Sequence, residues 1–225
     1  MNLPQIVYLQ TLTACNGHCR YCPFDDVYGN SEPQEMSFAD YSTVLCWLAE
    51  NKYQGRIGFL LHYEPTLDDR LCDWIGYARD VLPGIRLEAA TNGIIKPEFL
   101  NAFDHVDTVR AGSRIHCTSR AGNCKATPET TQRTRLEQPP CPVPGMTMCI
   151  AANGDVLLCC QDWRHEAVVG NVTDLTAARA KQLEYLPKVR AIEFEICRDC
   201  MAGKTAEEVG DRLGKRFIYE NTDNS

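Results

Sequence analysis

The stretch that decides the fold is QIVYLQTLTACNGHCRYC, residues 5–22, in which an apolar segment runs directly into three cysteines. The β-branched and apolar residues of 5–13 predict a first strand that ends where the cysteines begin. Cys15, Cys19 and Cys22 follow with the spacing C-x3-C-x2-C on one short segment, here called the cysteine loop. Clustered thiolates are soft metal ligands, so the stretch predicts a metal centre at the end of a strand.

Helices and strands alternate beyond this first strand. Ser37 opens a helix with a capping-box-like start, because an acid, Asp40, stands three residues later. Further strands are predicted at residues 56–61, 85–90 and 106–112, and further helices at residues 67–82 and 96–103. This order predicts an α/β fold with a parallel sheet and right-handed crossovers.

Polar segments follow each of the first three predicted strands. The cysteine loop follows the first, the HYEP turn (residues 62–65) follows the second, and the TNG turn (residues 91–93) follows the third. Parallel sheets carry their chemistry beyond the carboxyl ends of the strands. The three segments are therefore expected to meet at one site.

The composition narrows the class of protein. The chain has 225 residues, 44% of them hydrophobic and 24% charged, as in a globular protein with one core and a smaller appendage. No apolar run approaches the ~20 residues of a membrane helix, and the N-terminus lacks the features of a signal peptide. A net charge of −7 argues against nucleic acid as the main partner. We therefore expect a cytoplasmic protein that binds neither a membrane nor nucleic acid.

The 13 cysteines are an odd number in a chain without an export signal. A disulfide framework is disfavoured, because the cytosol keeps thiols reduced. Cys46 and Cys72 fall on predicted helices and are expected to be small buried side chains. The clustered cysteines are expected to bind metal.

The sequence changes character before its last third. Residues 117–140 are polar and without periodicity, which predicts a linker or covering loop between a first unit, residues 1–116, and a second, residues 141–225. In the second unit a helix is predicted at residues 174–186. The second unit is expected to be small and built around a hairpin.

The hairpin signal lies in residues 146–160, where two apolar runs flank Asn153-Gly154. This pair favours a tight turn because it accepts positive φ at both turn positions. The hairpin is expected to bring Cys141 and Cys159 to the same end. Cys159 and its neighbour are expected to lie in a strand and to point to opposite faces.

The cysteine loop offers three thiolates rather than four, and this number bears on which kind of metal centre it holds. An iron–sulfur cubane held by three cysteines leaves one iron open for a ligand from outside the protein. Structural zinc takes four closed ligands, and His18 is the alternative fourth ligand, although its place inside the triad makes it an awkward one. These residues alone are compatible with either an iron–sulfur cluster or a zinc ion.

The segment CNGHCRYC after a first strand resembles the radical S-adenosylmethionine (SAM) superfamily, whose signature is C-x3-C-x2-C on that loop. The resemblance implies a curtailed (β/α) partial TIM barrel with SAM bound at the open iron of a [4Fe–4S] cluster on Cys15, Cys19 and Cys22. Tyr21 precedes the last cysteine, as an aromatic residue commonly does there, and is an implied cofactor-binding residue. Reductive cleavage of SAM would give a 5′-deoxyadenosyl radical that abstracts hydrogen from a substrate.

Two of the turns also resemble parts of this superfamily. The HYEP turn stands where a Gly-Gly-Glu-Pro-like turn is usual, and it keeps the acid and the proline but neither glycine. Glu64 is implied to bind the SAM amino group, and Asn92 of the TNG turn to approach the nucleoside. The plain alternatives are a Glu before a helix-starting Pro and an ordinary polar turn.

Residues 139–200 resemble the SPASM/twitch extensions of radical SAM enzymes, which implies a small β-hairpin and helix domain with one auxiliary [4Fe–4S] cluster. Its implied ligands are Cys141, Cys159, Cys197 and Cys200. A four-thiolate zinc site is the alternative, since this spacing suits zinc too. Cys149 and Cys160 are either spare core thiols or distant ligands.

The resemblance implies an oxidoreductase, with a dehydrogenation of a small molecule as the leading reaction and the auxiliary cluster as electron acceptor. A peptide-modifying enzyme and a non-catalytic metal-holding scaffold are the alternatives. A flavodoxin or ferredoxin is implied as reductant. The catalytic base is not identified; Arg110, Arg114 and His116 near the fourth strand are either substrate contacts or solvated loop residues.

Overall fold

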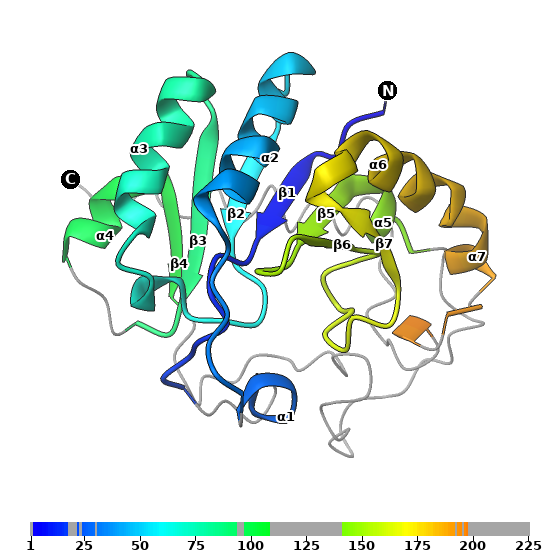
Figure 1. Ribbon diagram of the computed structural model, residues 1–225, viewed down its shortest axis with the longest axis horizontal. Coiled ribbons are helices and arrows are strands. Elements are labelled where there is room, and N and C mark those ends of the chain that lie inside the picture. Colours follow the sequence, from blue (N-terminus) through cyan, green and yellow to red (C-terminus); the bar gives the residue numbers. More distant parts are fainter. Residues whose placement is uncertain are drawn as a thin grey trace, which may run out of the picture.

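The computed structural model describes residues 2–17, 22, 24–29, 31–93, 97–108, 141–191, 193–194 and 196–197. Within these residues the strands form one seven-stranded sheet in the order β4-β3-β2-β1-β5-β6-β7 (Figure 1). The strands are β1 (Ile6–Leu9), β2 (Arg56–Phe59), β3 (Arg86–Thr91), β4 (His105–Thr108), β5 (Thr147–Ile150), β6 (Asp155–Leu157) and β7 (Val168–Asn171). The strands from β4 to β5 run parallel, whereas β6 and β7 are antiparallel. The predicted α/β fold with a mostly parallel sheet is confirmed.

Short and medium helices connect the strands. They are α1 (Phe24–Tyr28), α2 (Phe38–Glu50), the 3-10 turn η1 (Pro65–Leu67), α3 (Leu71–Val81), α4 (Pro97–Ala102), α5 (Val143–Met146), the 3-10 turn η3 (Val172–Asp174), α6 (Leu175–Glu184) and α7 (Leu186–Arg190). Figure 1 shows α2, α3 and α6 side by side along the sheet. In the part of the chain that the structure describes, no helix is both long and apolar enough to cross a bilayer.

The core explains why β1 is central. Val7 and Leu9 pack with the buried residues of α2, α3 and α6 on one face of the sheet. Ile6 and Tyr8 belong to a second, smaller apolar cluster on the other face. A strand covered on both faces needs a continuous apolar run rather than an alternating one, which is what the IVYL segment provides.

Local signals predicted the start of α2 correctly and the start of α3 too early. Ser37 caps α2 as predicted, since its Oγ accepts a hydrogen bond from the Asp40 N–H at 3.0 Å. The helix predicted from residue 67 begins instead at Leu71. The reason is a turn at Asp68, whose carboxylate accepts hydrogen bonds from both the backbone N–H and the side chain of Arg70.

The hairpin between β5 and β6 forms as predicted, but with a different turn. Of the two turn residues only Gly154 has a positive φ, 81°. The Asn153 side chain instead bonds to Asp155, accepting from its backbone N–H and donating to its carboxylate. A Cβ added at Gly154 would come within 3.0 Å of Val172, so both conformation and space favour glycine.

The C-terminal segment joins the sheet of the first unit. β5 pairs in parallel with β1, and the Gln10 N–H continues the ladder by donating to the Ile150 carbonyl at 2.9 Å. The hairpin is therefore an extension of the barrel sheet. The predicted linker, residues 117–140, lies outside the described residues, and the predicted division into units stays a prediction.

Arg179 of α6 connects this extension to the N-terminal segment by hydrogen bonds. Its side chain is fully buried, and burial lowers its pKa to about 10, which leaves it protonated at neutral pH. The guanidinium donates hydrogen bonds to the carbonyls of Asn2, Pro144, Gly145 and Thr147 and to Oε1 of Gln182. One side chain thus joins the N-terminal segment, α5 and the start of β5 to α6.

Candidate active site

The polar segments beyond β1, β2 and β3 contact one another, as their positions in the sequence predicted. In the HYEP turn, the Glu64 N–H donates to the carbonyl of Ala14, next to the first cysteine, at 2.9 Å. In the TNG turn, the Asn92 side chain donates to Oδ1 of Asn16 within the cysteine loop. The three segments therefore form one hydrogen-bonded unit at the carboxyl edge of the sheet.

The Glu64 carboxylate is the centre of this unit, and it is only 2% exposed. Its Oε1 accepts hydrogen bonds from the Thr66 N–H (3.1 Å), the Thr66 hydroxyl (2.7 Å) and the Thr91 hydroxyl (2.8 Å). Its Oε2 accepts one, from the Asn92 N–H at 2.7 Å. An ionised carboxylate offers about four acceptor positions, two on each oxygen, so Oε2 keeps room for one further donor.

We expect Glu64→Gln to lower the free energy of unfolding by about 1–3 kcal/mol, because the new amide NH₂ leaves one buried donor unpaired. Urea denaturation of the two proteins measures the difference. Glu50→Gln, at the exposed end of α2, is the matched control and should change stability by less than about 0.5 kcal/mol. Equal stability of Glu64→Gln and the native chain would contradict the central role of this carboxylate.

The described thiols of the cysteine loop suit a metal cluster. Cys15 and Cys22 are both half-buried, and the Cys15 Sγ accepts a hydrogen bond from the Gly17 N–H at 3.3 Å. An N–H donor to sulfur is a usual feature of iron–sulfur ligation. Cys19, Tyr21 and the alternative zinc ligand His18 lie outside the described residues.

Two of the C-terminal cysteines, Cys141 and Cys159, lie near the start of β5, whereas the cysteine loop follows the end of the neighbouring β1. Gln182 donates to the carbonyls of both Thr147 and Leu158, so the segment carrying Cys159 returns to the beginning of β5, just after α5 and Cys141. Cys159 and Cys197 are buried and Cys141 is half-buried; Cys200 lies outside the described residues. Among the described residues, no three His, Cys, Asp or Glu side chains are already arranged to hold a metal ion.

Two predictions about other cysteines are corrected. Cys159 and Cys160 lie in a turn after β6 and not in the strand, because β6 ends at Leu157 and the Asp162 N–H bonds back to the Cys159 carbonyl. Cys46 is exposed on α2 and is not a buried side chain. Cys149 is fully buried, and burial raises the pKa of its thiol. This environment fits a core thiol better than a metal ligand, because metals bind the thiolate form.

Two buried polar atoms follow these cysteines without a hydrogen-bond partner among the described residues. They are Oε1 of Gln161 and Nε1 of Trp163. Buried polar atoms are almost always paired, so these two atoms are expected to bond to a group outside the described residues. An indole N–H near cysteines suits the sulfur atoms of a cluster, which accept such bonds.

Three further residues, which sequence reasoning missed, complete the site. Oη of Tyr28, at the end of α1, lies 3.1 Å from Nε2 of His165, in the loop of residues 158–167. Gln10, the buried residue after β1, interacts with the Tyr28 hydroxyl and lowers the pKa of its phenol against the effect of burial. No local pattern marks this contact, because it joins residues 137 positions apart. Arg110, Arg114 and His116 lie outside the described residues.

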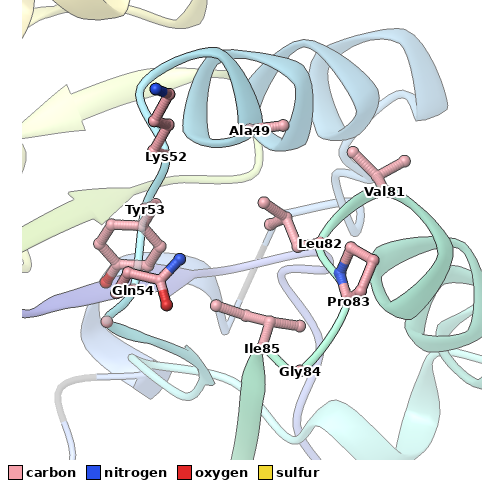
Figure 2. A pocket seen from close by; sticks show the side chains of 10 residues that line it. Ala49, Lys52, Tyr53, Gln54, Val81, Leu82, Pro83, Gly84 and Ile85 are labelled. Atoms are coloured by element: carbon pink, nitrogen blue, oxygen red, sulfur yellow. The ribbon is translucent and has the colours of Figure 1, made fainter.

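A separate hollow of about 360 Å³ opens at the opposite edge of the sheet, between the end of α2 and the turn before β3 (Figure 2). It is lined by residues that include Lys52, Tyr53, Val81, Leu82 and Ile85. Tyr53 also lines a second hollow, of about 710 Å³. Neither contains a predicted site residue, and both lie at the amino ends of the strands. The chemistry is therefore expected at the other edge.

The C-terminal part of the chain matches a known family. Residues 141–201 match the model of the SPASM domain, described as an iron–sulfur cluster-binding domain. The matched segment contains all four C-terminal cysteines that were predicted as ligands. The fold and the cysteines thus define an iron–sulfur protein built on a partial α/β barrel.

Most of the chain is similar to a curated enzyme and to two solved structures. It is 24% identical over 199 residues to the S-adenosyl-L-methionine-dependent 2-deoxy-scyllo-inosamine dehydrogenase of Niallia circulans, covering 74% of this chain and 78% of that protein. Its fold is similar to BtrN in complex with AdoMet and 2-DOIA, with a TM-score of 0.73, 20% identity, and coverage of 88% of this chain and 93% of that one. For BtrN in an open conformation the TM-score is 0.66 and the identity 22%, with coverage of 88% and 92%.

Residues 141–201 are therefore a SPASM-type domain, and the curated relative and the shared fold support a radical SAM protein. The SPASM match supports an iron–sulfur cluster in the C-terminal part, and the relative's dependence on SAM supports SAM as a cofactor. These findings support the family predicted from the two cysteine motifs.

Proposed function

We propose that the protein oxidises a secondary alcohol of a small cyclic polyol or aminocyclitol to a ketone. Its curated relative is a dehydrogenase of 2-deoxy-scyllo-inosamine, a compound of this kind. The reaction removes a hydrogen atom, a proton and an electron from one carbinol group. The protein therefore needs a site for each of the three.

The observation that carries the proposal is the parallel pairing of β1 with β5. The cysteine loop follows the end of β1, whereas Cys141 and Cys159 lie by the start of β5. The four paired residues of each strand, at ~3.3 Å each, span roughly 13 Å, so the start of β5 and the end of β1 are separated by about one strand length. This arrangement supports an electron acceptor beside a radical site.

Cys15, Cys19 and Cys22 hold the cluster that binds SAM, which when bound supplies the radical that takes the hydrogen atom. Glu64 contributes the acceptor position left on Oε2 to the SAM amino group. Asn92 approaches the nucleoside, and Tyr21 flanks the cluster. Glu64→Gln should therefore weaken SAM binding as well as stability, which calorimetric titration of the anaerobic protein with SAM can measure.

The auxiliary cluster, held by Cys141, Cys159, Cys197 and Cys200, supplies a one-electron acceptor. Cluster ligation needs reduced cysteines, which fits a cytoplasmic setting. A flavodoxin or ferredoxin delivers the electron that starts each turnover. The small-molecule substrate binds between the carboxyl edge of the sheet and the loop of residues 158–167.

The test uses the reconstituted full chain with SAM, a reductant and 2-deoxy-scyllo-inosamine, together with cyclitols that carry deuterium on one carbinol carbon. We expect deuterium in 5′-deoxyadenosine and an equal amount of ketone. Cleavage of SAM without ketone or deuterium transfer from any of these alcohols would contradict the substrate class. The absence of 5′-deoxyadenosine altogether would instead favour a non-catalytic scaffold.

A further inference from the structure

We propose that Tyr28 and His165 form a proton relay that removes the hydroxyl proton of the substrate. The inference rests on the proposed alcohol oxidation, which needs a base for that proton. Tyr28 is the residue that touches the hydroxyl, and His165 acts through Tyr28. Four features of the structure support this assignment.

The first feature is the position of the pair. Tyr28 ends α1, the helix that begins just after Cys22, and His165 lies in the loop that follows Cys159. Tyr28 Oη and His165 Nε2 are 3.1 Å apart, and the two rings meet edge-on with centroids 6.4 Å apart. The pair therefore bridges the segments that carry the two groups of cysteines, where a substrate losing both a proton and an electron would sit.

The second feature is the connection to the carboxyl edge of the sheet. The Gln10 side chain, 2% exposed just after β1, lies close enough to Tyr28 to lower the pKa of its phenol. Its Nε2 donates to the His62 carbonyl, at the start of the HYEP turn, at 3.2 Å. Gln10 thus links the surroundings of Tyr28 to the turn that carries Glu64.

The third feature is the backbone that carries His165. His165 has a φ of 56°, in the left-handed region that L-residues seldom occupy. The loop holds it there because the buried Asp162 carboxylate accepts hydrogen bonds from the N–H groups of Glu166 (3.0 Å) and Ala167 (2.9 Å). Strained backbone of this kind is concentrated at functional sites, where the surrounding structure maintains it.

The fourth feature is the protonation state. Burial lowers the pKa of His165, and the nearby carboxylates of Asp162 and Asp155 only partly oppose this effect. Burial raises the pKa of Tyr28, with the Gln10 side chain opposing this effect. At neutral pH the imidazole is therefore neutral and the phenol protonated, which is the state from which a relay can start.

In the proposed step the substrate loses a hydrogen atom, a proton and an electron. After the hydrogen atom leaves the carbinol carbon, the hydroxyl proton passes to Tyr28 Oη while the Tyr28 proton passes to His165 Nε2. The O–H bond of the substrate breaks and the C=O bond of the ketone forms. The remaining electron goes to a one-electron oxidant, an iron–sulfur cluster in the proposed function, and the imidazolium later releases its proton to water.

Tyr28→Phe tests the relay directly, because it removes the hydroxyl and keeps the ring. We expect 5′-deoxyadenosine still to acquire deuterium from the labelled alcohol, while ketone formation falls by roughly 10²–10⁴-fold, as for loss of a general base. Tyr77→Phe, on α3, is the matched control and should leave the ratio of ketone to 5′-deoxyadenosine unchanged. Iron content and SAM binding should stay native in both variants.

His165→Gly tests the second residue without straining the loop, because glycine accepts a positive φ. The native rate of ketone formation should fall as the pH drops through the pKa of His165, since only the neutral imidazole accepts a proton. That pKa lies below 6.5, the ordinary value, and NMR titration of the protein without substrate measures it independently. His165→Gly should lose this acid limb, and added imidazole should restore ketone formation.

The outcomes separate the relay from the proposed function. If the native protein itself forms no ketone, the proposed function fails and the relay fails with it. If the native protein and Tyr28→Phe form equal amounts of ketone per 5′-deoxyadenosine, only the relay fails. A parallel loss of iron, SAM binding and ketone in both variants, without rescue by imidazole, would assign the pair a structural role and overturn the inference.

Discussion

Replacing Cys22 by alanine will abolish 5′-deoxyadenosine formation while leaving the C-terminal iron–sulfur site loaded. In the proposed function the first cluster has three cysteine ligands and cannot be held by two, whereas two of the proposed C-terminal ligands, Cys141 and Cys159, lie near the start of β5 and are untouched. Iron should fall from about eight to about four atoms per chain, the content of one remaining cubane. Iron and sulfide analysis after anaerobic reconstitution, with product chromatography, measures both effects.

Cys46→Ala is the control for this variant, because Cys46 is a cysteine exposed on α2 and distant in sequence from both groups. It should keep both clusters and full SAM cleavage. Zinc in place of the remaining iron in Cys22→Ala would make the C-terminal site structural and remove the electron acceptor from the proposed reaction. Loss of all iron would show that the two sites do not load independently.

Replacing Arg179 by methionine should produce the largest loss of stability that the structure predicts outside the cluster ligands. The guanidinium is fully buried and donates to four backbone carbonyls and to Gln182. Methionine fills much of the same volume but removes the donor shared by these acceptors, of which the Thr147 carbonyl keeps a second bond, from Nε2 of Gln182. We expect the free energy of unfolding to fall by about 3–5 kcal/mol, as when one partner of a buried charged network is removed.

Urea denaturation of the anaerobic protein measures this loss, and Arg190→Met on the exposed side of α7 is the matched control. The control should change the free energy of unfolding by less than about 0.5 kcal/mol. Because Arg179 also holds the carbonyls of α5 beside Cys141, the variant should retain less auxiliary iron than the control. Equal stability of the two variants would mean that water satisfies the carbonyls when Arg179 is absent.

Much of the fold could be predicted because its signals are local. The IVYL run of β1, the Ser37 cap of α2 and the Gly154 turn each depend on a few neighbouring residues. The exposure of Cys46 and the turn at Cys159 could not be predicted, because a helical or apolar pattern does not say where an element stops or which side faces the core. The late start of α3 could not be predicted either, because it depends on the hydrogen bonds that the Asp68 carboxylate accepts from Arg70.

The sequence by itself determined the class of chemistry. The spacing of Cys15, Cys19 and Cys22 after a strand, and that of the C-terminal cysteines, predicts soft-metal ligation because clustered thiolates bind iron or zinc, and the resemblance to a known family favours iron–sulfur clusters. The order of strands also placed the cysteine loop and the HYEP and TNG turns at one edge, since parallel strands end on the same side.

Only the tertiary structure decided how these parts act on one another. It joins β5 to β1, makes the Glu64 carboxylate the link between turns, and brings His165 to Tyr28. These contacts span long distances along the chain and depend on the direction of single side chains and on which hydrogen-bond acceptors are already occupied. No spacing or periodicity encodes such directions, because the packing of the whole sheet and its loops sets them.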